Sequence, residues 1–374
     1  MDTVKYLVRV RCDTYNHAAY IKDALDGFCM QTTNFPFICT IFDDASTDGE
    51  PEIIRSYLQE HFELEDNVVG RREDTDDYTL IFARHKKNKN CYFAVYFLKY
   101  NHYSIKKQKL QYSQKFNECA KYVALCEGDD YWIDPYKLQK QFDALETHPT
   151  CSICLIKVNK VSRDGEPLGM TFPMANHIKP GIVQAEDFFL EEYSNNNWCF
   201  QTSSYFFRSE LLFKEDTERN VFFSHFHVGY LPTLLWALFH GDGFYIDEIE
   251  SCYRLFAGGF TTYRLFNKDW AINNLDKWLS AYSYIDKYTN YKYHKHISRK
   301  KGFKLLEKYY FQAKPLKMIN VRFWWQYYKQ PLWLVKLSLS FFPERFLSKL
   351  QDLWYMFKYK NRIKEMSVDT NFNS

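Results

Sequence analysis

The chain has 374 residues, with 49 lysines and arginines against 46 aspartates and glutamates, which is enough for one large α/β domain and an appendage. The charge is unevenly distributed. Residues 271–374 hold 20 basic and 7 acidic residues, a net charge of +13, while residues 1–270 hold 29 basic and 39 acidic residues. No run of 18 apolar residues is present and no signal sequence is visible after Met1, so we expect a cytoplasmic protein without a spanning helix.

The ten cysteines follow no repeating frame, which argues against a disulfide-rich or zinc-finger protein. Cys151 and Cys154 have the spacing of metal ligands, but no second Cys or His pair accompanies them. They also lie in an apolar run, Cys151 to Val158, which predicts a strand. We therefore expect buried, reduced thiols there and a reducing compartment.

The first 60 residues predict alternating strands and helices. Val4 to Asp13 has the composition of a strand and leads into a turn at Thr14 to His17. In the next segment five residues share one face of a helix: Tyr20, Ile21, Ala24, Leu25 and Phe28. A second strand, Phe37 to Phe42, ends in an acidic turn, and Pro51 opens another helix. This order predicts a doubly wound parallel sheet.

Residues 60–121 are less regular. Two β-rich runs, Tyr78 to Arg84 and Tyr92 to Leu98, flank the basic segment Lys86 to Asn90. That spacing predicts an inserted hairpin with a basic tip. The charge run Glu73 to Asp77 is predicted to be a solvated loop.

The most informative stretch is an apolar run, Tyr122 to Cys126, that ends abruptly in Glu127, Asp129 and Asp130. The run predicts a short buried strand. Carboxylates at its C-terminal end lie where open α/β sheets bind ligands, and a divalent cation would offset their mutual repulsion. The alternative is a solvated acidic turn, with Asp134-Pro135 capping the next helix.

Together these motifs resemble the family-2 glycosyltransferases of the GT-A fold, over roughly residues 4 to 265. The matching segments, in the family's order, are Tyr15-Asn16, Asp43 to Asp48, Glu127 to Trp132 with Asp134-Pro135 and Lys137 to Gln141, Gln201 to Ser204 with Phe207-Arg208, and Gly243 to Glu248 running into Tyr253-Arg254. The Glu-Gly-Asp-Asp-Tyr-Trp segment looks like that of a bacterial subgroup.

The resemblance implies an α/β fold of GT-A type, a doubly wound, mostly parallel sheet. Residues 1–268 would form the glycosyltransferase domain, with a nucleotide-sugar half over about 1–135 and an acceptor half over about 136–268. The implied activity is metal-dependent, inverting transfer of a hexose from a nucleotide-diphosphate donor, with a UDP-sugar expected. The acceptor would be a hydroxyl of a saccharide or lipid-linked acceptor in surface polysaccharide or glycolipid biosynthesis.

The resemblance also implies residue roles. Asp130 would hold the divalent cation, Mn²⁺ or Mg²⁺, with Asp129 beside it on the ribose or sugar. The nucleoside would be bound by Asp13, Tyr15 and Asp44, through base stacking and hydrogen bonds. Arg254, with Lys106 or Lys107, would contact the diphosphate.

Two departures from the family pattern concern catalysis. Relatives carry an acceptor-side aspartate in a Val-Gly-Asp-Trp-Pro segment, and here Tyr230 takes that place, although a tyrosine is a poor base at neutral pH. His225 and His227 are alternatives for the base, because a histidine ordinarily titrates near neutral pH, yet a lone histidine is more often structural. Relatives also carry a His where this chain has Phe256. The open alternative is a catalytically weak protein that binds nucleotide sugars or acts in an assembly.

Residues 269–374 form a basic, aromatic-rich region in which we expect helices, including one over Phe303 to Phe311. Three more apolar or aromatic segments follow: Phe323 to Tyr328, Leu332 to Phe342, and the stripe between Phe346 and Phe357. Leu332 to Phe342 would reach only about 16 Å as a helix, half of a bilayer core. Such helices suit peripheral binding to an anionic surface, at the inner face of the cytoplasmic membrane. The alternative is packing on the catalytic domain or on a second copy in a homo-oligomer. Nucleic acid is a poorer partner, because no recognised module is present.

Overall fold

The computed structural model of the chain describes residues 6–65, 70–173, 178–189, 200–213, 216–255 and 268–311. The chain divides into two compact units, Met1–Leu255 and Phe256–Ser374. The predicted domain boundary at residue 268 stays a prediction. No helix within the described ranges has both the length and the apolar character needed to cross a membrane.

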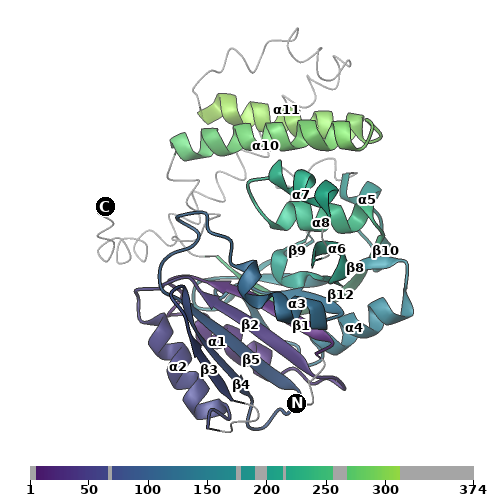
Figure 1. The fold of residues 1–374 in the computed structure, drawn as a ribbon. Coiled ribbons are helices and arrows are strands. Elements are labelled where there is room, and N and C mark those ends of the chain that lie inside the picture. Colours follow the sequence, from purple (N-terminus) through teal and green to yellow (C-terminus); the bar gives the residue numbers. More distant parts are fainter. Residues whose placement is uncertain are drawn as a thin grey trace. The chain divides into compact units, whose positions relative to one another are not determined.

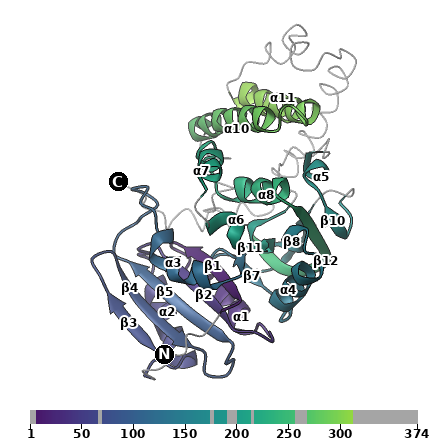
Figure 2. The same ribbon diagram turned by 45° about the vertical axis from the view of Figure 1, so that its right-hand side comes forward.

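The first unit begins with alternating strands and helices (Figure 1). They are β1 (Val8–Thr14), α1 (Ile21–Cys29), β2 (Phe37–Asp43), α2 (Glu50–His61), β3 (Arg71–Asp74), β4 (Tyr78–Arg84), β5 (Cys91–Leu98), the 3-10 turn η1 (Leu110–Ser113), α3 (Gln114–Cys119), β6 (Tyr122–Leu125) and β7 (Tyr131–Trp132). The remaining elements, most of which Figure 2 labels, are α4 (Lys137–Thr147), β8 (Cys151–Val161), β9 (Pro167–Phe172), β10 (Gly181–Val183), α5 (Ala185–Phe189), the 3-10 turn η2 (Thr202–Ser204), β11 (Phe206–Arg208), α6 (Glu210–Phe213), α7 (Thr217–Ser224), α8 (Tyr230–Phe239) and β12 (Asp242–Arg254).

The described strands form one twelve-stranded sheet. Its order is β10-β12-β8-β11-β6-β1-β2-β5-β4-β3, with β7 also pairing with β12 and β9 with β8. The central strands β6, β1, β2 and β5 pair in parallel, and so do β8 and β12. The other pairs are antiparallel. The predicted α/β class with a large central sheet is confirmed, and β1, β2 and β6 end at the same edge of it.

The central strands β2 and β5 are buried on both faces along their whole length, and most of their residues are apolar. Cys39 and Ile41 of β2 pack in the cluster that contains the apolar faces of α1 and α2. The alternate residues Ile38 and Phe42 pack on the opposite face, with Phe116 of α3. Each such side chain contributes about 1.5–3 kcal/mol on burial, so helices on both faces hold the strand ends in place.

Two predictions about residues 71–98 need correction. The predicted hairpin exists as β4 and β5, but it is not an insertion, because β5 pairs in parallel with β2. All eight residues of β5 are buried, since neither of its faces carries a charged side chain. The charge run Glu73 to Asp77 is not all loop either, because Arg71–Asp74 forms the edge strand β3. At an edge the backbone can pair with β4 while the charged side chains stay in solvent.

Other predictions for the first unit are confirmed. Helix α1 buries the predicted apolar face, including Ile21, Leu25 and Phe28. The apolar run after residue 150 is strand β8, in which the free thiols of Cys151 and Cys154 are buried.

The second unit contains two long helices that pack side by side in both views, α10 (Lys268–Tyr288) and α11 (His294–Phe311) (Figures 1 and 2). A hydrogen bond of 2.7 Å between Asp286 Oδ2 and His294 Nδ1 closes the turn between them. The predicted helix over Phe303 to Phe311 is confirmed as part of α11. The three predicted segments between Phe323 and Phe357 lie outside the described residues.

Candidate active site

The turns that follow β1, β2 and β6 meet at the carboxyl edge of the sheet, where open α/β sheets bind ligands. Backbone hydrogen bonds join them directly. The amide of Asp44 donates to the carbonyl of Thr14 at 3.0 Å, and the amide of Gly128 donates to the carbonyl of Asp13 at 3.1 Å. The parallel register of the three strands therefore brings together acidic residues that lie up to 117 positions apart in the sequence.

Gly128 is required by the close approach of two of these turns. A Cβ atom at this position would lie 2.0 Å from Thr14 Oγ1 and 2.6 Å from Thr14 Cβ, so no larger residue fits without moving the backbone. The glycine lets the acidic turn after β6 lie directly against the end of β1.

A buried glutamate links the turns after β1 and β2. Glu50, the first residue of α2, accepts hydrogen bonds from the Thr14 hydroxyl, the His17 amide at 2.8 Å and the Ser46 hydroxyl at 2.9 Å. The Ser46 hydroxyl also accepts from the amide of Asn16, whose φ of 55° is left-handed. The Tyr-Asn pair and the Asp-Asp-x-Ser-x-Asp turn, noticed separately in the sequence, are thus one hydrogen-bonded structure.

Three carboxylates lie close together in the turn after β6. Glu127, Asp129 and Asp130 each offer one oxygen, and these atoms lie within 4.8 Å of one another. Burial, and then the charges of Asp129 and Glu127, raise the pKa of Asp130 well above its ordinary value. The pKa of Glu127 is raised as well, by desolvation and then by Asp129 and Asp13. A hard divalent cation, which prefers oxygen ligands, fits this excess of negative charge.

Asp130 is held by partners from two distant segments. Its Oδ2 accepts from Gln201 Nε2 at 2.8 Å, and its Oδ1 accepts from the amide of Arg254 at 3.0 Å. The Gln201 side chain is itself fixed, because its Oε1 accepts from the amide and the hydroxyl of Ser203. The Gln201 to Ser204 motif was noticed in the sequence, but nothing in the sequence linked its amide to Asp130.

Arg254 lies at the end of β12 and its side chain is almost fully buried. Its guanidinium donates to the Asp129 carbonyl at 3.0 Å and to Asp23 Oδ2 at 2.7 Å. It also lies 4.7 Å from the ring centre of Tyr20 and 4.9 Å from that of Tyr131. The guanidinium thus supports the acidic turn. The predicted diphosphate contact stays a prediction.

Asp13 and Asp44 share a lysine that the sequence did not single out. Lys109 Nζ lies 3.2 Å from Asp13 Oδ1 and 3.6 Å from Asp44 Oδ2. Burial raises the pKa of Asp13, but the charges of Arg11, 2.7 Å away, and Lys109 outweigh this and hold its pKa below the ordinary value. Both carboxylates thus have a lysine partner, whereas Asp129 in the turn after β6 lies 3.9 Å from the Nε2 atom of a histidine, His17.

Asp44 also organises the loop that precedes α3. Its two carboxylate oxygens accept from the amides of His102 at 2.8 Å and Tyr103 at 3.1 Å. Of the lysines predicted in this loop, Lys107 turns away and pairs with Asp77 at 2.7 Å. The loop contains three lysines, Lys106, Lys107 and Lys109, and the sequence alone did not indicate which of them would lie beside Asp44.

The other predicted residues lie as follows. Tyr15 is 44% exposed in the turn after β1, where its ring is accessible for stacking. His227 lies between α7 and α8, and Tyr230 is the first residue of α8. The structure therefore brings Asp13, Asp44, Asp129, Asp130 and Arg254 into one connected group. The catalytic roles suggested for His227 and Tyr230 stay predictions.

A second acidic group lies between the start of α4 and β12. Its carboxylates, from Asp134, Glu248 and Glu250, surround Lys140 Nζ at 2.6, 2.6 and 3.2 Å. The Lys140 ammonium pairs with all three carboxylates and offsets part of their charge, so we interpret this group as a structural ion-pair cluster. The acidic turn after β6 is the better candidate for a metal.

Comparison with known proteins gives partial matches. No family model matches the chain. An uncharacterized protein of Mycobacterium bovis and one of Mycobacterium tuberculosis are each 35% identical to it over 152 residues, which is 41% of this chain. The match spans only 35% of each relative's length.

Two solved structures resemble the chain, and one of them is a mannosyltransferase. TarS of S. aureus, solved with UDP, is 16% identical with a TM-score of 0.40, over 78% of this chain and 74% of that one. The mannosyltransferase PcManGT of Pyrobaculum calidifontis, solved with GDP-Man and Mn²⁺, is 13% identical with a TM-score of 0.45, over 90% and 87%. Similarities this low do not establish a substrate or an activity for this chain.

Proposed function

We propose that the chain is a metal-dependent glycosyltransferase that moves a sugar from a nucleoside-diphosphate donor, a UDP-sugar, to an acceptor hydroxyl with inversion. The observation that carries this proposal is the group of three carboxylates at the carboxyl edge of the parallel strands, next to Asp13 and Asp44. Saccharide or lipid-linked acceptors in surface polysaccharide or glycolipid synthesis fit the same proposal.

The residues divide into two groups by their partners. Asp129 and Asp130 belong to the acidic turn after β6, where burial and neighbouring carboxylates raise the pKa of Asp130, and they would hold Mn²⁺ or Mg²⁺. A divalent cation there supplies positive charge against the diphosphate leaving group. Asp13 and Asp44, whose charges Lys109 balances, would accept hydrogen bonds from the base and ribose, with Tyr15 stacked on the base.

Gln201 and Arg254 position the acidic turn after β6. Gln201 and the Arg254 amide hold the two oxygens of Asp130 in fixed directions. The Arg254 guanidinium binds the Asp129 carbonyl, so it orients the turn without neutralising its carboxylates. The turn can therefore keep its negative charge available for a cation.

The decisive experiment is a donor panel on the full-length protein. We expect UDP-sugars with Mn²⁺ to raise the melting temperature and to release UDP when an acceptor is added. Removal of the metal with EDTA should abolish both effects. Stabilisation by all nucleotides alike, or without metal, would contradict the proposal.

A second candidate is a protein that binds nucleotide sugars but does not transfer them. Tyr230 favours it, because a tyrosine opens α8 where relatives of the resembled family carry a carboxylate base. The same panel separates the two functions. Metal-dependent donor binding without any UDP release, across a broad set of acceptors, would favour the binding protein.

A further inference from the structure

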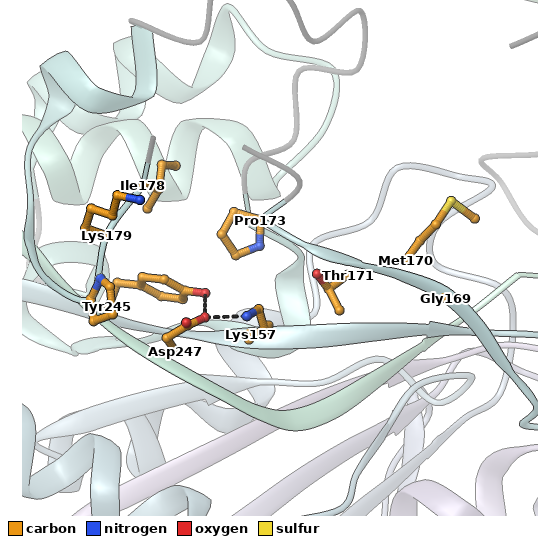
Figure 3. A pocket seen from close by; sticks show the side chains of 10 residues that line it. Lys157, Gly169, Met170, Thr171, Pro173, Ile178, Lys179, Tyr245 and Asp247 are labelled. Carbon is orange, nitrogen blue, oxygen red and sulfur yellow. Dashed lines mark hydrogen bonds and ion pairs between the residues drawn. The ribbon is translucent and has the colours of Figure 1, made fainter. Parts of the chain in front are cut away.

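A pocket of about 430 Å³ lies beside β8, β9 and β12 (Figure 3). None of the residues that line it belongs to the acidic turn after β6. Its volume is in the range of sites that bind small molecules. Its polar lining comes from Lys157, Thr171, Lys179, Tyr245 and Asp247. Met170 and Ile178 add apolar surface, and Met170 is 36% exposed.

Some polar groups of the pocket have unused hydrogen-bonding capacity. Asp247 Oδ1 accepts from the Tyr245 hydroxyl at 2.7 Å and from Lys157 Nζ at 2.6 Å, as Figure 3 shows, which leaves Oδ2 as a further acceptor. Within the described part of the chain, the side chains of Thr171 and Lys179 make no hydrogen bond or salt bridge, and Lys179 acts on Asp247 through its charge alone. Two ammonium groups face one carboxylate, so the pocket carries a net positive charge.

These groups suit one class of ligand. Sugar hydroxyls both donate and accept, which matches Asp247 Oδ2 and the Thr171 hydroxyl, while the C–H face of a sugar ring can pack on Met170. The surplus ammonium of Lys179 calls for an anion. We propose that the pocket binds a sugar unit bearing a carboxylate or phosphate, as an inner unit of the acceptor. This inference rests on the proposed glycosyltransferase function.

The β8–β9 hairpin connects the pocket with the acidic turn. Val161 of β8 is the register partner of Arg254, and Lys157 lies four residues earlier, roughly 13 Å along the strand. At the hairpin tip, a Cβ atom on Gly165 would lie 3.3 Å from the hydroxyl of Tyr131, which follows the acidic turn. A short oligosaccharide can span that distance, with its end at the acidic turn and an inner unit in the pocket.

The test measures binding of three probes to the full-length protein without donor, by ligand-observed NMR titration. The probes are methyl β-glucoside, methyl β-glucuronide and glucose 6-phosphate. We expect at least one anionic probe to bind at least tenfold more tightly than the neutral one, and the tighter of the two anions identifies the group. Lys179→Met should remove this preference.

Lys99→Met is the matched control, because it breaks a Lys–Asp pair of 3.0 Å with Asp74 at the opposite end of the strand order. It should leave the preference for anions unchanged. Equal binding of all three probes, or equal losses in Lys179→Met and Lys99→Met, would overturn the inference.

Calorimetry with UDP and Mn²⁺ on the same variants separates this inference from the proposed function. Donor binding should be unchanged in Lys179→Met. If the protein releases UDP in the presence of an acidic acceptor and Lys179→Met does not slow this release, the pocket inference is wrong while the proposed function stands. If UDP and Mn²⁺ do not bind while the Lys179-dependent preference persists, the acceptor role fails together with the proposed function.

Discussion

At the scale of single residues, the carboxylates of the site differ in what surrounds them. Asp13 and Asp44 lie beside Lys109, whereas the hydrogen-bond donors to Asp130 among the described residues are neutral and two of its neighbours are acidic. A charge that is poorly balanced in the ligand-free protein gains most from a cation, because the cation relieves both repulsion and desolvation. This difference is why we place the metal at Asp130.

Asp130→Ala should abolish transfer, with a loss of roughly a thousandfold or more, because a bound metal supplies several kcal/mol of transition-state stabilisation. The protein should stay folded, since the change removes a desolvated charge. Calorimetry with UDP and Mn²⁺ checks the assignment, and metal-dependent affinity that survives in the variant would refute it. Glu248→Gln, in the acidic group that pairs with Lys140, is the control and should keep that affinity.

Asp44→Asn should weaken UDP binding both with and without metal, by about tenfold, since hydrogen bonds to a charged group contribute about 1.5–3 kcal/mol. An asparagine cannot accept from both the His102 and Tyr103 amides as a carboxylate does. Titrations with UDP in Mn²⁺ and in EDTA measure the effect. A loss confined to the Mn²⁺ titration would instead place Asp44 at the metal.

We expect Asp43 to make the free energy of unfolding depend on pH. Desolvation raises its pKa to about 6, with hydrogen bonds from Ser46 opposing the shift, and the side chain is buried. The folded state therefore keeps this proton to higher pH than the unfolded chain does, so the stabilisation present below about pH 4 is lost as pH rises to about 6. Asp43→Asn should gain up to roughly 2–3 kcal/mol relative to wild type between pH 4 and pH 7.

Urea unfolding of both proteins at pH 4, 5, 6 and 7 measures that difference. Asp76→Asn, at an exposed position, is the control and should run parallel to wild type over the same range. If Asp43→Asn also runs parallel to wild type, Asp43 is not protonated in the folded state at pH 5.

At the scale of elements, Lys140 ties α4 to both the turn after β7 and to β12. Its three carboxylate partners come from these two segments, and one of them, Glu250, is fully buried. The same β12 carries Arg254, which reaches the acidic turn. The ion-pair cluster therefore stabilises the strand that delivers a supporting residue to the site.

Lys140→Met should destabilise the protein by about 1–3 kcal/mol, because it removes the hydrogen bond that the Lys140 ammonium donates to the buried Glu250 and leaves Lys137 as the nearby positive charge. Urea unfolding at pH 7 is the measurement. Lys22→Met is the control, since it breaks one exposed pair within α1 and should cost less than about 0.5 kcal/mol. Adding Glu250→Gln to Lys140→Met should restore part of the loss, and equal costs for the two lysine variants would rule out this role for the cluster.

At the scale of the whole molecule, the two units differ in charge as well as in architecture. The basic residues concentrate after residue 270, and α10 and α11 are the described part of that region. Near an anionic bilayer each such base contributes roughly 1 kcal/mol, so a few of them together with apolar insertion would hold the protein there. We therefore expect the second unit to be the membrane-binding part.

Truncation before Phe323 should release the protein from vesicles of anionic lipid at physiological salt. UDP binding by the first unit should be unchanged, because the predicted nucleotide-binding residues all lie before residue 256. Vesicle sedimentation and calorimetry check the two statements. Full-length protein that ignores such vesicles, or truncation that unfolds the first unit, would mean that the C-terminal segments are packing elements.

The sequence by itself determined the α/β class and the acidic ends of β1, β2 and β6. Apolar runs of strand length and helical periodicity are local signals, and parallel pairing then brings the strand ends to one edge. It did not reveal that β5 belongs to the sheet centre, that Gln201 and Arg254 hold Asp130, or that Lys109 rather than Lys107 faces Asp44. Those partners come from segments far apart in the chain, and only the packed tertiary structure decides which side chains meet. The pocket at Asp247 likewise exists only once β8, β9 and β12 are assembled, because no local pattern specifies a cavity.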